Sequence, residues 1–114
     1  MSVFALAAKH EMLDALDVDR IQLHTGDPGA DGTANVISDT MQTAAWDSAA
    51  TGKRALTATV EYTELTPSQA VTWVSVWKAG EPNVFKGKGE GSGDLAANAE
   101  GELKVTQCDL IIDD

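Results

Sequence analysis

The stretch IQLHTGDPGADGTANVIS, residues 21–38, joins a short strand to a long turn and decides the fold. In IQLH, apolar residues alternate with polar ones, and this period of two predicts a strand with one buried face and one face in water. The residues after His24 are rich in Asp, Pro, Gly and Asn. These residues favour tight turns because they fix φ, allow positive φ or bond to their own backbone. We therefore predict a turn after His24 and a second strand that starts near Val36.

A helical pattern precedes this strand. Ser2 is a suitable N-cap, and apolar residues recur at the 3.6-residue spacing of one helix face as far as Leu16. We predict an amphipathic helix from Ser2 to about Leu16, within an N-terminal helical segment of residues 1–17. His10 lies near the apolar face, and we interpret it as a packed or half-exposed histidine. The face consists of Val3, Leu6, Leu13 and Leu16, with Phe4, Ala8 and Met12 beside it.

Only strand-like segments follow the turn. Residues 54–62, RALTATVEY, alternate most regularly and predict a strand with one face in the core. Residues 71–78, VTWVSVWK, are β-branched or aromatic on both faces, which predicts a central strand covered on both sides or placed at a subunit contact. Trp73 and Trp77 share one face of this strand. Shorter strands are expected at residues 41–46, 84–88 and 102–112.

The segments between these strands are predicted loops. Residues 47–53 are small and polar and end in a glycine turn. Residues 87–101 are rich in Gly, Ala, Ser and Asn, so we expect a mobile loop or a loop that a partner orders. Within the last predicted strand the apolar phase changes. This slip predicts a β-bulge near Thr106 or Gln107.

The length and the order of these patterns define the predicted architecture. A chain of 114 residues can bury one core, so we predict a single domain over residues 1–114, in which residues 20–114 form the β domain. A helix followed by short, regularly spaced strands favours a mainly β fold. We expect an antiparallel β-sandwich or barrel of about six short strands with one N-terminal α-helix.

The charge balance limits the classes of partner. The chain has 18 acidic and 8 basic side chains, which gives a net charge of −10. Such a field repels phosphate backbones and anionic lipid headgroups, so we expect neither nucleic acid nor a membrane surface as a partner. No apolar run approaches the roughly 20 residues of a bilayer span, and the start of the chain lacks a signal-peptide pattern. The single cysteine excludes an internal disulfide and fits folding in a reducing cytoplasm.

Residues that could carry chemistry are few. His24 lies near Thr25 and Asp27, but no serine is close in sequence, so a histidine bonded to the turn is the favoured interpretation. GKGEGSG lacks the GK[ST] and the following helix of a phosphate loop, and two His and one Cys are too few for a zinc site by themselves. Asp27, Asp31 and Asp39 are the calcium candidates. Because each fits turn chemistry and their spacing matches no calcium motif, we expect no metal, no cofactor and no catalytic residue.

The aromatic residues allow two interpretations. The three tryptophans and Tyr62 could stack on sugar rings, but Trp73 and Trp77 lie in the most apolar strand, where such residues usually anchor a core or an interface. Cys108 lies in an apolar strand and is predicted to be a buried, unreactive thiol. The candidate interface residues are Val3, Phe4, Leu6, Trp73, Trp77 and Phe85.

The order of these motifs resembles that of a family of small bacteriophage virion proteins. The resemblance is carried by LHTGDPGADGTANV at residues 23–36, Trp46, RAL at residues 54–56 and VTWVSVW at residues 71–77. Members of the family are variously described as tail-fibre, minor tail or head-decoration proteins. The aromatic and basic residues that the family has before the first tryptophan are replaced here by MQTAA. The resemblance implies a part of a virus particle and brings no catalytic residue with it.

The size and charge suggest where such a part would lie. An acidic chain of 12.0 kDa without heptads or long repeats suits a compact knob present in many copies. We expect a decoration protein, made in the host cytoplasm, that docks on the major capsid protein at the outer surface of the virion. Docking would use the N-terminal helix or the Gly-rich loop, and copies would associate as a homo-oligomer. A tail-fibre or minor tail protein is the second expectation, and a carbohydrate-binding module for host attachment is the rival of another class.

Overall fold

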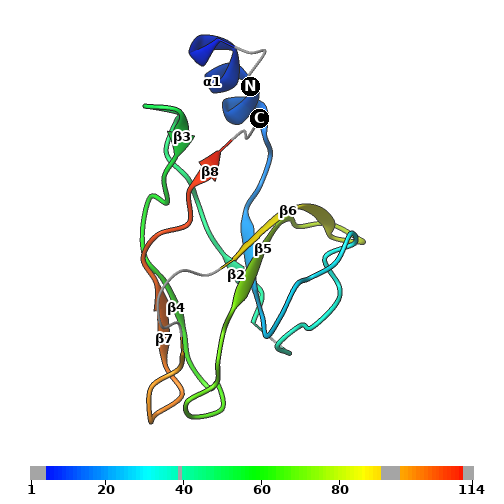
Figure 1. Cartoon of the computed structure of the whole chain (residues 1–114), viewed down its shortest axis with the longest axis vertical. Helices are drawn as coiled ribbons and strands as arrows, with labels where there is room; N and C mark the ends of the chain where they lie inside the picture. The colour runs from blue at the N-terminus through cyan, green and yellow to red at the C-terminus, as the bar shows by residue number, and fades with distance from the viewer. Residues whose placement is uncertain (1–4, 39, 91–95, 112–114) are drawn as a thin grey trace.

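One α-helix precedes eight short strands in the computed structural model, which describes residues 5–38, 40–90 and 96–111 (Figure 1). Every strand pair in this part of the chain is antiparallel. The predicted fold class is therefore confirmed: the chain is mainly β, with antiparallel sheets and one N-terminal helix, although its strands are shorter and more numerous than expected. In chain order the elements are α1 (Leu6–Ala15), β1 (Arg20–His24), β2 (Gln42–Thr43), β3 (Lys53–Arg54), β4 (Val60–Tyr62), β5 (Trp73–Lys78), β6 (Val84–Glu90), β7 (Leu103–Val105) and β8 (Leu110–Ile111).

The strands are divided among three sheets. Four strands pair in the order β2-β1-β5-β6, while β3 pairs with β8 and β4 pairs with β7. β5 is an inner strand, as its composition predicts, because β1 and β6 border it. Figure 1 shows α1 at one end of the molecule and the turns that follow β4 and precede β7 at the other. The molecule is elongated, with a radius of gyration of 14.4 Å against roughly 13 Å for a compact chain of this length.

Apolar residues of β1 form the centre of the core. Ile21 and Leu23 are fully buried, and the hydroxyl of Tyr62 donates to the carbonyl oxygen of Ile21 at 3.1 Å, which joins β4 to β1. The core thus draws on α1 and on all three sheets. Its other buried members are Leu13, Ala44, Trp46, Val60, Val71, Val76, Leu103, Val105 and Leu110.

The predicted wet face of β1 is wrong. Gln22 is 8% exposed and His24 is 0% exposed, because the chain that follows the turn folds back over them. Pairing restarts at Val36 as predicted, but only as a single antiparallel bridge to His24. The N–H of Ile37 then donates to the carbonyl oxygen of Leu23 at 3.0 Å. The polar side of β1 is therefore covered by the segment that leaves the turn.

Residues 54–62 do not form the single strand that their alternation predicts. The segment begins in β3, which pairs with β8, and ends in β4, which pairs with β7. Between the two strands, the N–H of Thr57 donates to the carbonyl oxygen of Ala45 at 2.9 Å. The backbone is thus diverted from one partner to another. The predicted phase holds in β4, where Val60 and Tyr62 are buried.

The helix is shorter and less buried than predicted. α1 begins at Leu6, and the predicted start at residues 2–4 lies outside the described residues. Leu13 is the buried residue of α1, so the helix contributes little apolar contact. Instead, the guanidinium of Arg54 donates from Nη1 to the carbonyl oxygens of Leu13 and Leu16, both at 3.1 Å. The Leu13 carbonyl oxygen also accepts from the N–H of the C-cap residue Leu16 at 3.2 Å, so the cation adds further bonds at the C-terminal end of the helix.

Two predicted features of the C-terminal half are wrong. β6 continues past residue 87 to Glu90, and residues 96–101 form an ordered turn, so these parts of the predicted Gly-rich loop are structured. Residues 91–95 and Ile112 lie outside the described residues. The predicted last strand is divided into β7 and β8, which pair with different strands. The change of apolar phase therefore marks a crossing between sheets and not a bulge.

The turn before β7 can be tested with Gly101→Ala. Gly101 has a φ of 76°, and a Cβ added there would collide with the carbonyl oxygen of Leu65. We expect the free energy of unfolding, measured by urea denaturation, to fall by about 2 to 3 kcal/mol. Glu100→Ala, at an exposed position of the same turn, is the control and should change this free energy by less than about 0.5 kcal/mol. A Gly101→Ala protein as stable as the wild type would contradict this turn.

Candidate functional site

A buried hydrogen-bonded network joins β1 and β5 beneath the turn. In the imidazole of His24, Nε2 lies 2.7 Å from Oγ of Ser75, and Nδ1 lies 2.9 Å from the carbonyl oxygen of Ala34. The indole Nε1–H of Trp77 donates to the same Ser75 oxygen at 2.7 Å. His24 and Ser75 are both 0% exposed. The antiparallel pairing of β1 with β5 brings these side chains together.

The donors and acceptors of this network fix its protons. A carbonyl oxygen only accepts, so Nδ1 of His24 carries the proton that is shared with Ala34. An indole N–H only donates, so the oxygen of Ser75 accepts from Trp77. The Ser75 hydroxyl then donates its own proton to Nε2 of His24. The network therefore holds His24 in its Nδ1–H tautomer.

A serine that donates to a histidine is also the arrangement of a nucleophile with its base. Here both side chains are fully buried, so a substrate cannot reach them. The favoured interpretation of His24, a histidine bonded to the turn, is confirmed by its contact with Ala34. Ser75 was not predicted as its partner because it lies 51 residues away. Only the pairing of the two strands, which one sequence does not specify, could have indicated it.

A second set of hydrogen bonds satisfies Gln22, the other buried polar side chain of β1. The side-chain amide of Gln22 donates to Oγ1 of Thr40 at 2.8 Å and to the carbonyl oxygen of Ile37 at 3.2 Å. The Thr40 hydroxyl in turn donates to Ile37 at 2.6 Å and accepts from the N–H of Leu23 at 3.2 Å. These bonds compensate the burial of Gln22 and hold the returning segment against β1.

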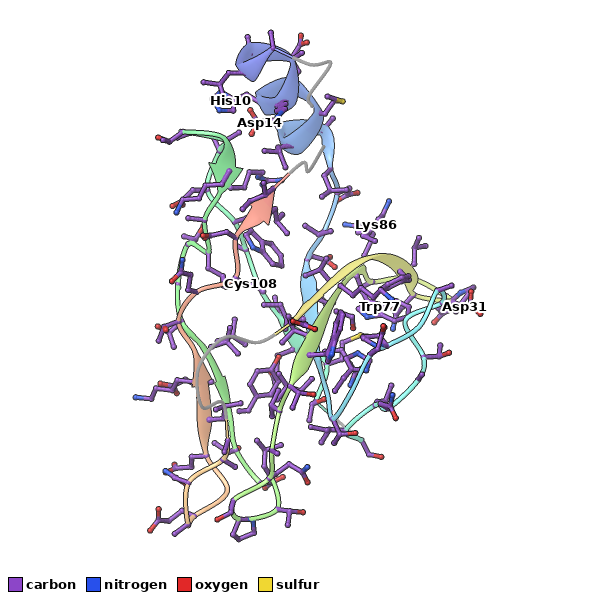
Figure 2. The ribbon with its side chains drawn as sticks, in the orientation of Figure 1. His10, Asp14, Asp31, Trp77, Lys86 and Cys108 are labelled. Carbon is purple, nitrogen blue, oxygen red and sulfur yellow. The ribbon has the colours of Figure 1, made fainter. Side chains whose placement is uncertain are left out.

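The acidic residues of the turn serve different purposes. Oδ1 of Asp27 lies 2.7 Å from the ammonium of Lys88 and accepts from the N–H of Gly29 at 2.8 Å. Lys88, and then Gly29, hold the pKa of the Asp27 carboxyl below its usual value. Asp31 is exposed at the outer end of the turn (Figure 2), and Asp39 lies outside the described residues. Among residues 5–38, 40–90 and 96–111, no three metal-ligating side chains form a group.

The aromatic interface candidates pack inside the chain. Trp77 is 9% exposed, and its ring centroid lies 5.2 Å from that of Phe85. The Phe85 ring rests on Gly32, where any side chain would collide with it. Trp73 is half-buried, with the ammonium of Lys88 5.6 Å from its ring centroid. Trp77 is therefore a core residue, one of the two roles expected for it, and with Phe85 it joins the sheet to the turn.

The remaining tryptophan also lacks a free face. Trp46 is buried, and its Nε1–H donates to the carbonyl oxygen of Cys108 at 2.7 Å. Trp73 is then the one half-exposed tryptophan, and a lysine covers its ring. This placement gives no support to a flat aromatic platform for sugars.

The side chains of the N-terminal segment are partly engaged. Nε2 of His10 accepts a hydrogen bond from the N–H of Gly52 at 2.9 Å, and Figure 2 shows His10 on the side of α1 that faces β3. This contact fits the interpretation of a half-exposed histidine. Leu6, an interface candidate, is 56% exposed. Val3 and Phe4 lie outside the described residues.

An apolar groove separates α1 from the sheet. Its volume is about 300 Å³. The floor consists of Val74 and Val76 of β5 with Gly87 and Gly89 opposite them on β6. The two glycines add no side chain to this floor. Gly87 and Gly89 thus lie in a strand and not in a phosphate loop. The walls include Met12, Leu13, Leu16, Lys86, Cys108, Leu110 and Ile111.

Comparisons with protein-family models, with curated proteins and with solved structures found no match to this chain. Within residues 5–38, 40–90 and 96–111, no helix has the length and apolar character needed to cross a membrane.

Ser75→Ala tests the buried network. The substitution removes the acceptor of Trp77 Nε1–H and the donor to His24 Nε2, and each unpaired buried group costs about 1 to 3 kcal/mol. We expect the free energy of unfolding to fall by about 2 to 4 kcal/mol, whereas Ser48→Ala, at an exposed position, should change it by less than about 0.5 kcal/mol. Nitrogen-15 NMR of wild-type His24 should report the Nδ1–H tautomer. An Nε2–H tautomer, or equal stability of the two variants, would contradict the network.

The partial burial of Cys108 predicts that the stability of the protein depends on pH in the alkaline range. Burial, followed by the charge of Asp109, raises the pKa of this thiol from 9.0 to about 11. A raised native pKa contributes stability that is complete below pH 9 and is lost as the pH approaches 11. In urea unfolding under reducing conditions, Cys108→Ala should therefore lose roughly 2 kcal/mol less than the wild type across this interval. Equal losses in the two proteins would contradict this burial of the thiol.

Proposed function

We propose that this protein is a non-enzymatic structural component of a bacteriophage particle, namely a small decoration protein that binds the outside of the head and stabilises it. The sequence support is the resemblance of residues 23–36, 54–56 and 71–77 to motifs of small virion proteins. These motifs form the turn, part of the β3 region and most of β5. They therefore build the scaffold of the domain and not a reactive site.

The observation that carries the proposal is the contrast between polar and apolar groups. His10 and His24 bond to the chain itself, and no buried side-chain polar atom of the described residues lacks a hydrogen-bond partner. Leu6, Met12 and Ile111, in contrast, are exposed near the end of the molecule that carries α1. The polar groups thus bond within the chain, whereas apolar side chains are exposed to solvent. This combination supports a function of binding other proteins.

The acidic charge of the chain supports a place on the outer surface of the particle. The chain has a net charge of −10. Its end remote from α1 carries the exposed residues Glu61, Glu64, Glu100 and Glu102 (Figure 1). Such a surface opposes packing against DNA and is tolerated in solvent. Exposed acids also lie at the α1 end, namely Glu11, Asp14 and Asp17, so charge alone does not orient the protein. The exposed apolar side chains do, and we therefore orient the α1 end toward the major capsid protein and the opposite, acidic end outward.

Stabilisation would follow from mass action. A protein that binds the assembled lattice, and not its dissociated subunits, shifts the equilibrium toward the lattice. Many copies arranged around local symmetry axes would add their contributions. Neither effect needs a catalytic group.

Heat-induced DNA release tests the proposal. Particles that lack this protein should release DNA at a lower temperature than complete particles, and added purified protein should restore the difference. Leu6→Asp, at the α1 end, should restore it less well than the matched acidic-end variant Glu100→Gln. Equal release temperatures with and without the protein would contradict decoration of the head.

A tail-fibre or minor tail protein is the second candidate, favoured by an elongated shape of 44 × 28 × 24 Å. Immunogold labelling of particles separates the two locations. Label on the tail, with intact heads and lost adsorption in the deletion strain, would support this candidate in place of decoration.

A further inference from the structure

We infer that the apolar groove between α1, β6 and β8 is a contact face between two copies of this chain. The inference rests on the proposed function, because a protein that works by assembling needs a surface for its own copies. It goes further by naming that surface and the residues that form it.

The floor of the groove contains two glycines that the fold itself does not require. Gly87 and Gly89 lie in β6, opposite Val76 and Val74 of β5, and neither has a positive φ. A Cβ at Gly89 would meet nothing within 4 Å, and one at Gly87 would make an ordinary contact of 3.6 Å with Val76. Glycine inside a strand weakens it and often marks a place where another chain approaches closely. The two glycines therefore point to an occupant from outside.

The groove and two projecting apolar side chains lie on the same face. Met12 and Ile111 line the groove, yet they are 37% and 58% exposed. A contact related by a two-fold axis requires one patch to provide both the hollow and the group that fills it. This face meets that requirement, because Ile111 of one copy can enter the hollow above Gly89 of the other. A second copy is thus the occupant that the face itself specifies.

Charge complementarity agrees with this occupant. Lys86 is the extra residue at the irregularity where Val76 faces Gly87 and Trp77 faces Phe85. Figure 2 shows Lys86 on the side of β6 toward α1, and within the described part of the chain it forms no ion pair. Asp109 lines the same groove, so a two-fold contact can bring Lys86 of one copy toward the Asp109 carboxylate of the other. This local attraction acts against the overall repulsion between two chains of net charge −10.

Self-association of the purified full chain, measured by sedimentation equilibrium under reducing conditions, tests the inference. The wild type should form a reversible dimer. Gly89→Val fills the hollow and Ile111→Glu places a charge on the projecting group. Each should raise the dimer Kd about tenfold or more. Ala58→Val is the control, because it introduces a valine, as Gly89→Val does, at an exposed position away from the groove. It should leave the dimer Kd unchanged.

Thermal unfolding of each variant shows that an altered Kd reflects the contact and not lost structure. If Gly89→Val does not fold, Ile111→Glu decides, because its side chain is already exposed. A wild type that stays monomeric, or a dimer indifferent to both variants, would overturn the inference. If the wild type is monomeric and these variants no longer bind the particle, the groove binds another virion protein. This outcome would also overturn the inference, but it would leave the proposed function intact. A dimer that both variants weaken would support the inference even if particles lacked the protein.

Discussion

The buried polar bonds around β1 are the constraint on which the rest of the structure depends. Gln22 and His24 can leave water only because Ile37, Ala34 and Ser75 supply partners for them. Those partners come from the turn and from β5, so neither can move without leaving a buried group unpaired. Apolar packing gives the core its stability, but these directional hydrogen bonds determine the position of the turn over β1 and the strand that pairs with β1.

The sequence predicted the parts of the fold that local pattern controls. The turn after β1, the inner position of β5 and the helix before the sheet follow from residue type and spacing alone. The alternation of apolar and polar residues gave wrong strand boundaries where one segment pairs with two different strands. Residues 54–62 alternate as one strand but divide between β8 and β7, and a similar division separates β7 from β8. Periodicity reports which face of a strand is buried, but it does not report when the partner changes.

The candidate sites were predictable to a smaller extent. That His24 would bond to the turn followed from its place at a strand end, whereas Ser75 required knowledge of which strands pair. Composition indicated that Gly87 and its neighbours would be a loop, because glycine is rare in regular strands. The structure places them in β6, and the same absence of side chains that misled the prediction opens the groove. Their meaning depends on what lies opposite them, which is Val74 and Val76.

The attachment of α1 has a consequence for acid tolerance. The guanidinium of Arg54 donates to the backbone carbonyl oxygens of Leu13, Leu16, Trp46 and Asp47. Neither a guanidinium nor a carbonyl changes its charge over the pH range in which proteins stay folded. Contacts of Asp27 and Asp109 with lysines, by comparison, weaken when those carboxylates take up protons below their lowered pKa values. On acidification, the hydrogen bonds from Arg54 to these backbone carbonyls should therefore persist after the two surface ion pairs have weakened.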